Sequence, residues 1–164
     1  FKSQEVIFLD KMPLNFRHIG FIFSSFPEAK VIHMNRDPMA TCWSIYKYYF
    51  NGNSYSFNQD DLAQYYLLYK DLMSFWHKKF PNKIFEISYE NLTINQEYET
   101  RRMLEYCELD WDENCLKFYE NKSEVKTTSA LQVRQKMYQG SSEVWKKYES
   151  YLQPLISGLN YYKS

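Results

Sequence analysis

Residues 10–44, DKMPLNFRHIGFIFSSFPEAKVIHMNRDPMATCWS, decide the fold of this chain. Lys11 follows one apolar run, Arg36 follows a second, and Ser44 lies further on, in an expected helix. Parallel α/β sheets gather the residues that follow their strands at the carboxyl edge, where such sheets bind ligands. Because two cations and a hydroxyl meet there, we expect an anion such as phosphate or sulfate to bind.

The rest of the chain alternates strand and helix signals. Pro13 and Asp37-Pro38 suit the first turns of two helices. Pro27 ends the helix that Pro13 begins, and Pro81 ends the helix over 60–79. Apolar runs predict strands over residues 5–9, 30–35 and 84–88. Apolar residues at three- and four-residue steps predict helices over 13–26, 38–50, 60–79, 95–106, 112–119 and 141–151. This alternation indicates the α/β class, with a parallel sheet flanked by helices.

The composition excludes several classes of function. The 20 basic and 20 acidic residues cancel, so neither nucleic acid nor an anionic membrane surface is an expected partner. The apolar runs are shorter than the about 18 residues of a membrane helix. Hydrophobic residues make up 45% of the chain, which predicts a folded core.

The three cysteines are widely spaced and form no C-x-x-C motif, so we expect reduced thiols and a cytoplasmic location. The chain begins with Phe1 rather than methionine, and three strands are few for such a sheet. We therefore expect one domain over residues 1–164 that is truncated at its N-terminus.

Each candidate site residue has two interpretations. Arg36 could hold an anion with its planar fork of donors, beside the positive end of the helix at Pro38, or it could pair with Asp37. In the second case Ser44 is surface. Lys11 could stabilise charge on a leaving group, or it could be a solvated lysine.

Later residues leave similar alternatives open. Tyr89 follows the strand over 84–88 and could reach the same edge, or it could belong to the core. Residues 127–145 form a polar segment that could cover a nucleotide or could be a surface loop.

Other common sites are not expected. The histidines, His18, His33 and His77, lack ligand spacing, so no metal site is predicted. The 4 glycines form no phosphate-binding loop of the G-x-x-x-x-G-K-[ST] or G-x-G-x-x-G kind.

Three segments in order resemble the sulfotransferases that use 3′-phosphoadenosine 5′-phosphosulfate (PAPS). They are DKMPLNFRHIGFIFSSFPEAKVIHMNRDPMATCWSIYKYYF, ISYENL and SALQVRQKMYQGSSEVWKKYESYLQPL. Within the family, the likeness is to the bacterial branch often fused to tetratricopeptide repeats, which is related to tyrosylprotein sulfotransferases. The resemblance implies a partial P-loop-kinase-like three-layer fold and the product 3′-phosphoadenosine 5′-phosphate (PAP).

The resemblance also implies roles for single residues. Arg36 and Ser44 would hold the 3′-phosphate, and Tyr89 would touch it. Lys11 and Ser129 would be catalytic, with Lys11 stabilising the bridging oxygen and Ser129 lying near the 5′-phosphosulfate.

Two more residues, Arg134 and Trp145, would lie in the segment that covers the cofactor. The family's 5′-phosphosulfate loop is absent from this sequence, and the general base of the related enzymes is expected upstream of Phe1. Val144 and Tyr48 stand where the family often has basic residues.

We therefore expect the 3′-phosphate half of a cofactor site, with weak or no turnover by this chain alone. The acceptor would be a hydroxyl or amine of a small molecule, carbohydrate or peptide. Two alternatives are a non-catalytic PAP-binding or nucleotide-binding module and a structural or interaction domain. Self-association into a homo-oligomer is also expected if the sheet exposes an unpaired edge.

Overall fold

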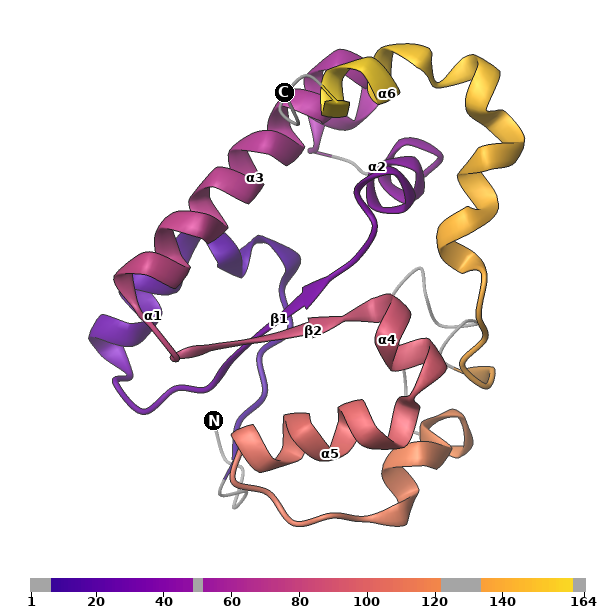
Figure 1. The fold of residues 1–164 in the computed structure, drawn as a ribbon. Coiled ribbons are helices and arrows are strands. Elements are labelled where there is room, and N and C mark those ends of the chain that lie inside the picture. Colours follow the sequence, from indigo (N-terminus) through magenta and orange to yellow (C-terminus); the bar gives the residue numbers. More distant parts are fainter. Residues whose placement is uncertain (1–6, 49–51, 122–133, 161–164) are drawn as a thin grey trace.

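The computed structural model describes residues 7–48, 52–121 and 134–160 (Figure 1). Within these residues the sheet has two strands, β1 (Val31–Asn35) and β2 (Ile84–Ser88). They pair in parallel, and the register sets His33 opposite Glu86. The predicted α/β class, with a parallel sheet flanked by helices, is confirmed.

The helical elements surround this sheet. In chain order they are η1 (Pro13–His18), α1 (Ile19–Ser25), α2 (Pro38–Tyr46), η2 (Ser54–Phe57), α3 (Gln59–Lys79), α4 (Tyr89–Ile94), α5 (Gln96–Tyr106), η3 (Glu113–Glu120), η5 (Ser141–Tyr151) and α6 (Gln153–Asn160). The η elements are 3-10 helices. None of the described helices is both long enough and apolar enough to cross a bilayer.

The two faces of the sheet carry different helices, because successive strand residues point to opposite sides. On one face, Ile84 packs in a buried cluster with Phe23 of α1 and Met73 of α3. On the other face, Phe85 stacks on Tyr106 of α5 with ring centroids 5.1 Å apart. The sheet therefore lies between two helix layers.

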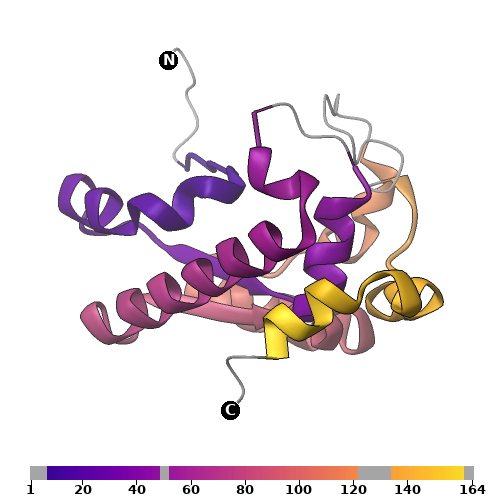
Figure 2. The ribbon, with the colours of Figure 1, turned by 90° about the horizontal axis from the view of Figure 1, so that it is seen from above.

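A second core lies beyond the end of the sheet, where α6 packs on α3 and α2. Figures 1 and 2 both show α6 lying beside α3. Leu155 is fully buried there, and Gly158 lies so close to α3 that an added Cβ would be 2.7 Å from Cβ of Ala63. Glycine is therefore required for this close approach.

The predicted strand over residues 5–9 is wrong for the part that is described. Residues 7–9 form no strand, and Leu9 is 83% exposed. An apolar run becomes a strand only where a neighbouring strand takes up its backbone hydrogen bonds, and residues 7–9 pair with neither β1 nor β2. Residues 5 and 6 lie outside the described residues.

Helical elements form in every predicted helical range. The range 13–26 is divided into η1 and α1, and the ranges 112–119 and 141–151 form the 3-10 helices η3 and η5. However, α2 ends at Tyr46 rather than at residue 50, and the sequence reasoning missed α4 and α6. In α4 the hydroxyl of Ser88, a residue taken only as the end of a strand, accepts from the backbone N–H of Asn91 and so begins a helix at once.

Candidate functional site

Arg36 lies between the end of β1 and the start of α2. Asp37 caps α2, and its side chain accepts from the backbone N–H of Ala40 at 2.7 Å, with Pro38 in the first turn. No ion pair joins Arg36 to Asp37 among the residues that the structure describes. The helix cap thus uses the nearest carboxylate and leaves the guanidinium to other partners.

Those partners come from distant segments. Nη2 of Arg36 donates to the carbonyl oxygen of Ser141 at 3.1 Å and to its Oγ at 3.3 Å, and Nε donates to Oγ of Ser142 at 3.3 Å. The guanidinium also lies over the ring of Tyr89, 4.7 Å from the centroid. Arg36 therefore joins the end of β1 to η5 and α4.

Glu90 forms a second link to η5. Its Oε1 accepts from Oγ of Ser142 at 2.5 Å and from the backbone N–H of Asp37 at 3.1 Å, and its Oε2 accepts from Oγ of Ser88. Burial raises the pKa of the Glu90 carboxyl, but these hydrogen bonds outweigh burial and hold the pKa below its ordinary value. Glu90 is therefore ionised at neutral pH.

This link gives the fold a sensitivity to acid. Because the folded-state pKa of Glu90 lies below its unfolded-state value of about 4.3, the ionised form stabilises the fold fully above that pH. The contribution is lost as the pH falls through the folded-state pKa. Glu90→Gln should therefore flatten the fall in melting temperature below about pH 4.3. Glu105→Gln, at an exposed carboxylate of α5, should not; parallel curves for Glu90→Gln and the wild type would contradict the link.

A cavity of about 100 Å³ lies beside Arg36. Its lining residues are Arg36, Ala40, Trp43, Ser44, Lys47, Tyr89, Tyr138, Ser141 and Val144. The structure thus brings together three of the residues predicted from the sequence, Arg36, Ser44 and Tyr89. Among the described residues that line the cavity, two are cations and none is a carboxylate, so an anion is the favoured occupant.

Several donors around this cavity have no protein acceptor. Within the described residues, Nη1 of Arg36 and the hydroxyl of Ser44 make no hydrogen bond, and the buried Nε1 of Trp43 has no partner. A buried N–H without an acceptor is costly unless a ligand or water completes it. Trp43 is held in place by stacking on Tyr148 of η5, with centroids 4.7 Å apart.

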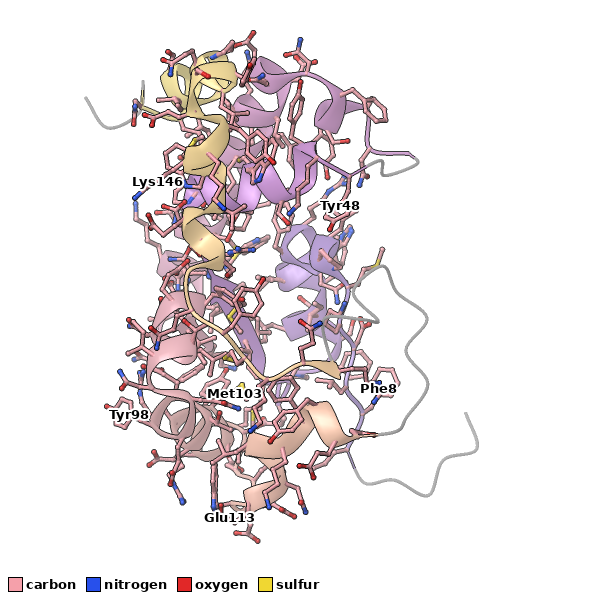
Figure 3. All side chains as sticks on the ribbon, turned by 90° about the vertical axis from the view of Figure 1, so that its right-hand side faces the viewer. Phe8, Tyr48, Tyr98, Met103, Glu113 and Lys146 are labelled. Atoms are coloured by element: carbon pink, nitrogen blue, oxygen red, sulfur yellow. The ribbon has the colours of Figure 1, made fainter. Side chains whose placement is uncertain are left out.

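Figure 3 shows η5 from the right-hand side of Figure 1 and labels Lys146, whose ammonium pairs with Glu143 of the same element. Tyr48, just after α2, and Phe8, in the N-terminal segment, are labelled in the same view. Of the nine lining residues of the 100 Å³ cavity, Ser141 and Val144 come from η5.

Lys11 lies at a different cavity, of about 410 Å³, which runs along β1. A third cavity of about 180 Å³ shares Pro13 and Met34 with it and shares Arg36 with the 100 Å³ cavity. Lys11 and Arg36 therefore do not line the same cavity. The three cavities are neighbours, because the 180 Å³ cavity shares at least one lining residue with each of the other two.

The remaining predicted residues are not gathered at the 100 Å³ cavity. Ser129 lies outside the described residues. Arg134 is exposed, and Trp145 is half-buried on η5, where Val144 lines the cavity instead.

Sequence reasoning missed Glu90, Ser141 and Ser142. The one local signal was Gly140, whose φ of 86° marks a turn directly before the two serines. Nothing in the sequence indicated that His33 and His77 lie together. In the structure their ring centroids lie 6.0 Å apart.

Comparison with known proteins gives the family. Residues 2–113 match the family model described as Sulfotransferase family. The chain is 37% identical over 158 residues to an uncharacterized protein of Aquifex aeolicus (strain VF5), and the match covers 94% of this chain and 21% of that protein. The chain thus spans about a fifth of the length of this relative. The match to the family model covers more than half of this chain. The chain therefore belongs to the sulfotransferase family.

Proposed function

We propose that this chain forms the 3′-phosphate-binding part of a PAPS-dependent sulfotransferase. The enzyme would transfer a sulfuryl group from PAPS to a hydroxyl or amine of a small molecule, carbohydrate or peptide and would release PAP. One observation carries the proposal. Arg36, directly after β1, and Ser44 and Lys47 from α2 and its C-terminal end line a cavity that has no carboxylate among its described lining residues.

The size and the donors of the cavity suit a single phosphate. At about 100 Å³ it is far smaller than the roughly 300–1,000 Å³ of pockets that hold whole ligands. Arg36 offers the N–H donors of Nη1, Ser44 a hydroxyl and Trp43 an N–H. The guanidinium of Arg36 lies over the ring of Tyr89, 4.7 Å from the centroid.

PAPS would supply the sulfuryl group and a phosphate leaving group. The acceptor proton would pass to a base, and Lys11 would place a positive charge where the leaving group becomes negative. The cavity that Lys11 lines, at about 410 Å³, falls within the size range of ligand pockets. This assignment of Lys11 rests on its position after residues 7–9 and on the family, because no described contact links it to Arg36.

Ser44→Ala tests the proposal with little structural disturbance. The Ser44 hydroxyl holds no protein partner among the described residues, so its loss should leave the melting temperature unchanged. PAP affinity measured by calorimetry should fall about 10- to 100-fold, the range for a hydrogen bond to a charged group. Ser25→Ala, at an exposed serine of α1, should leave affinity unchanged. Equal PAP affinity in Ser44→Ala and the wild type would refute the assignment.

The separation of Lys11 from Arg36 favours one second candidate, a PAP-binding module without turnover. Calorimetry with PAP and with ATP measures binding for either candidate. Sulfation of a phenol or carbohydrate by a longer natural chain, abolished by Lys11→Ala, would support the enzyme. PAP binding without any such activity would favour the module.

A further inference from the structure

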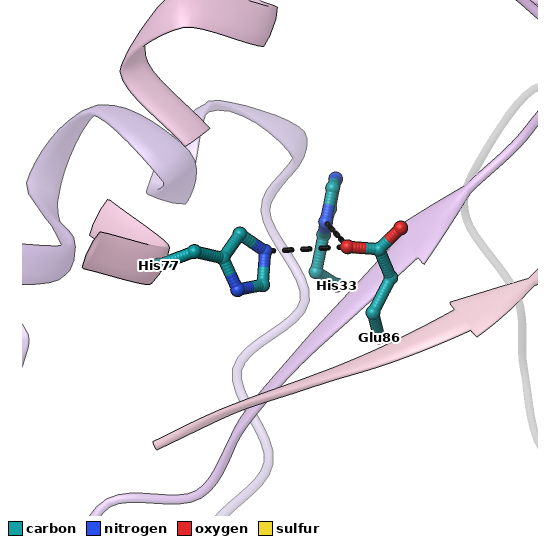
Figure 4. A group of neighbouring side chains, drawn as sticks. All are labelled: His33, His77 and Glu86. Atoms are coloured by element: carbon teal, nitrogen blue, oxygen red, sulfur yellow. Dashed lines mark ion pairs between the residues drawn. The ribbon is translucent and has the colours of Figure 1, made fainter. Parts of the chain in front are cut away.

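A separate group of polar side chains lies between the sheet and α3 (Figure 4). The β1–β2 register sets His33 opposite Glu86, on the face that α3 covers, and the last turn of α3 brings in His77. Figure 4 shows both imidazole rings beside the carboxylate of Glu86. None of these residues lines the 100 Å³ anion cavity.

The distances suit one small cation. Nδ1 of His33 lies 3.7 Å from Oε2 of Glu86, and Nε2 of His77 lies 3.3 Å from the same oxygen. The three ligand atoms lie within 4.8 Å of one another. Tetrahedral zinc, with bonds of about 2.0–2.2 Å, holds its ligand atoms roughly 3.3–3.5 Å apart. Small side-chain movements would therefore complete the geometry.

The two ring nitrogens that face Glu86 lie at ion-pair distance from its Oε2 but make no hydrogen bond to it. Nδ1 of His33 and Nε2 of His77 are buried and make no hydrogen bond within the described residues, and the side chain of His33 is only 10% exposed. A buried nitrogen without a hydrogen bond is costly, and an ion held together with Oε2 of Glu86 would remove that cost for both rings.

Outer contacts hold the ligands in suitable orientations. The other nitrogen of His33, Nε2, bonds to the hydroxyl of Tyr69, so Nδ1 remains for a metal. The other oxygen of Glu86, Oε1, accepts from Nδ2 of Asn35 at 3.1 Å, so Oε2 remains. Metal-binding histidines and carboxylates commonly have such partners, which fix the ring and the carboxylate.

We propose that His33, His77 and Glu86 bind a divalent transition-metal ion, with zinc the best fit. Two imidazoles and one carboxylate form a donor set that zinc uses, and a water would take the fourth position. The side chains of His77 and Glu86 are 34% and 47% exposed, so solvent reaches the group. The ion would join β1, β2 and α3 just before Arg36, and His33 also lines the 410 Å³ cavity that Lys11 lines.

Zinc binding by the whole chain, freed of metal with a chelator, tests this site. Calorimetry should give one zinc per chain in the wild type. His77→Ala and Glu86→Gln should each weaken zinc binding at least about tenfold. His18→Ala, at an exposed histidine of η1, should leave it unchanged, as should Cys107→Ser combined with Cys115→Ser. Cobalt should give the visible absorption of a tetrahedral site, and His77→Ala should lose it.

Zinc should also raise the melting temperature of the wild type but not that of Glu86→Gln. The amide oxygen of Glu86→Gln can still accept from Nδ2 of Asn35, so this variant should keep the fold. It therefore tests zinc binding even if His77→Ala fails to fold. Equal zinc affinity in the wild type, His77→Ala and Glu86→Gln would overturn the proposal, as would a loss in His18→Ala as large as that in His77→Ala. PAP affinity measured with chelator present reports on the anion cavity separately.

Discussion

Arg36→Ala is expected to weaken PAP binding about 100-fold or more and to destabilise the fold as well. The guanidinium is the central cation of the 100 Å³ cavity, and it also holds η5 through Ser141 and Ser142. Losing these hydrogen bonds should lower the free energy of unfolding by about 1–3 kcal/mol. Calorimetry with PAP and urea unfolding of the same sample measure both effects.

Two further variants separate these effects. Arg36→Lys keeps the charge but loses the planar fork, so we expect it to recover only part of the PAP affinity. Ser44→Ala should lose affinity without losing stability. If Arg36→Ala bound PAP as tightly as the wild type while unfolding at lower urea, Arg36 would be a structural tie between β1 and η5 only, and the phosphate assignment would fail.

Leu155→Ala should have the largest effect on stability alone. Leu155 is fully buried in the cluster with Leu62 and Cys42 that fixes α6 on α3. Removing a buried leucine side chain leaves a cavity, so the free energy of unfolding should fall by about 2–5 kcal/mol in urea titrations. Leu68→Ala, at a residue of α3 that is 66% exposed, should change it by no more than about 0.5 kcal/mol. Equal losses in the two variants would contradict the packing of α6 on α3.

Local chemistry explains what the sequence predicted well. Asp37 and Pro38 carry a complete helix-start signal within two positions, and the structure forms that cap. The apolar residues 7–9 carried an equally clear strand signal, yet they form no strand. A helix satisfies its hydrogen bonds within itself, whereas a strand depends on a neighbour that local sequence does not reveal.

The candidate site divides in the same way. Arg36 and Tyr89 could be placed together because each directly follows a strand. Ser44 could be placed with them because it lies in the helix that follows Arg36. Ser141 and Ser142 could not be, because tertiary folding alone joins them to Arg36 across more than 100 residues.

The group of His33, His77 and Glu86 shows the same limit. Its members come from β1, α3 and β2, so no spacing along the chain could indicate it. Strand register and the end of a long helix set its geometry, and both are properties of the folded chain.

The contact between Gly158 and Ala63 has a consequence for how this chain can vary. Since a methyl group at Gly158 would already collide with that of Ala63, a larger side chain at either position would force the two helices apart. Mutational drift at these sites must therefore be paired, with any gain in volume on one helix matched by a loss on the other. Glycine is the only residue smaller than alanine, so Ala63 can lose volume in one way only. Gly158 and Ala63 can therefore change together in very few ways.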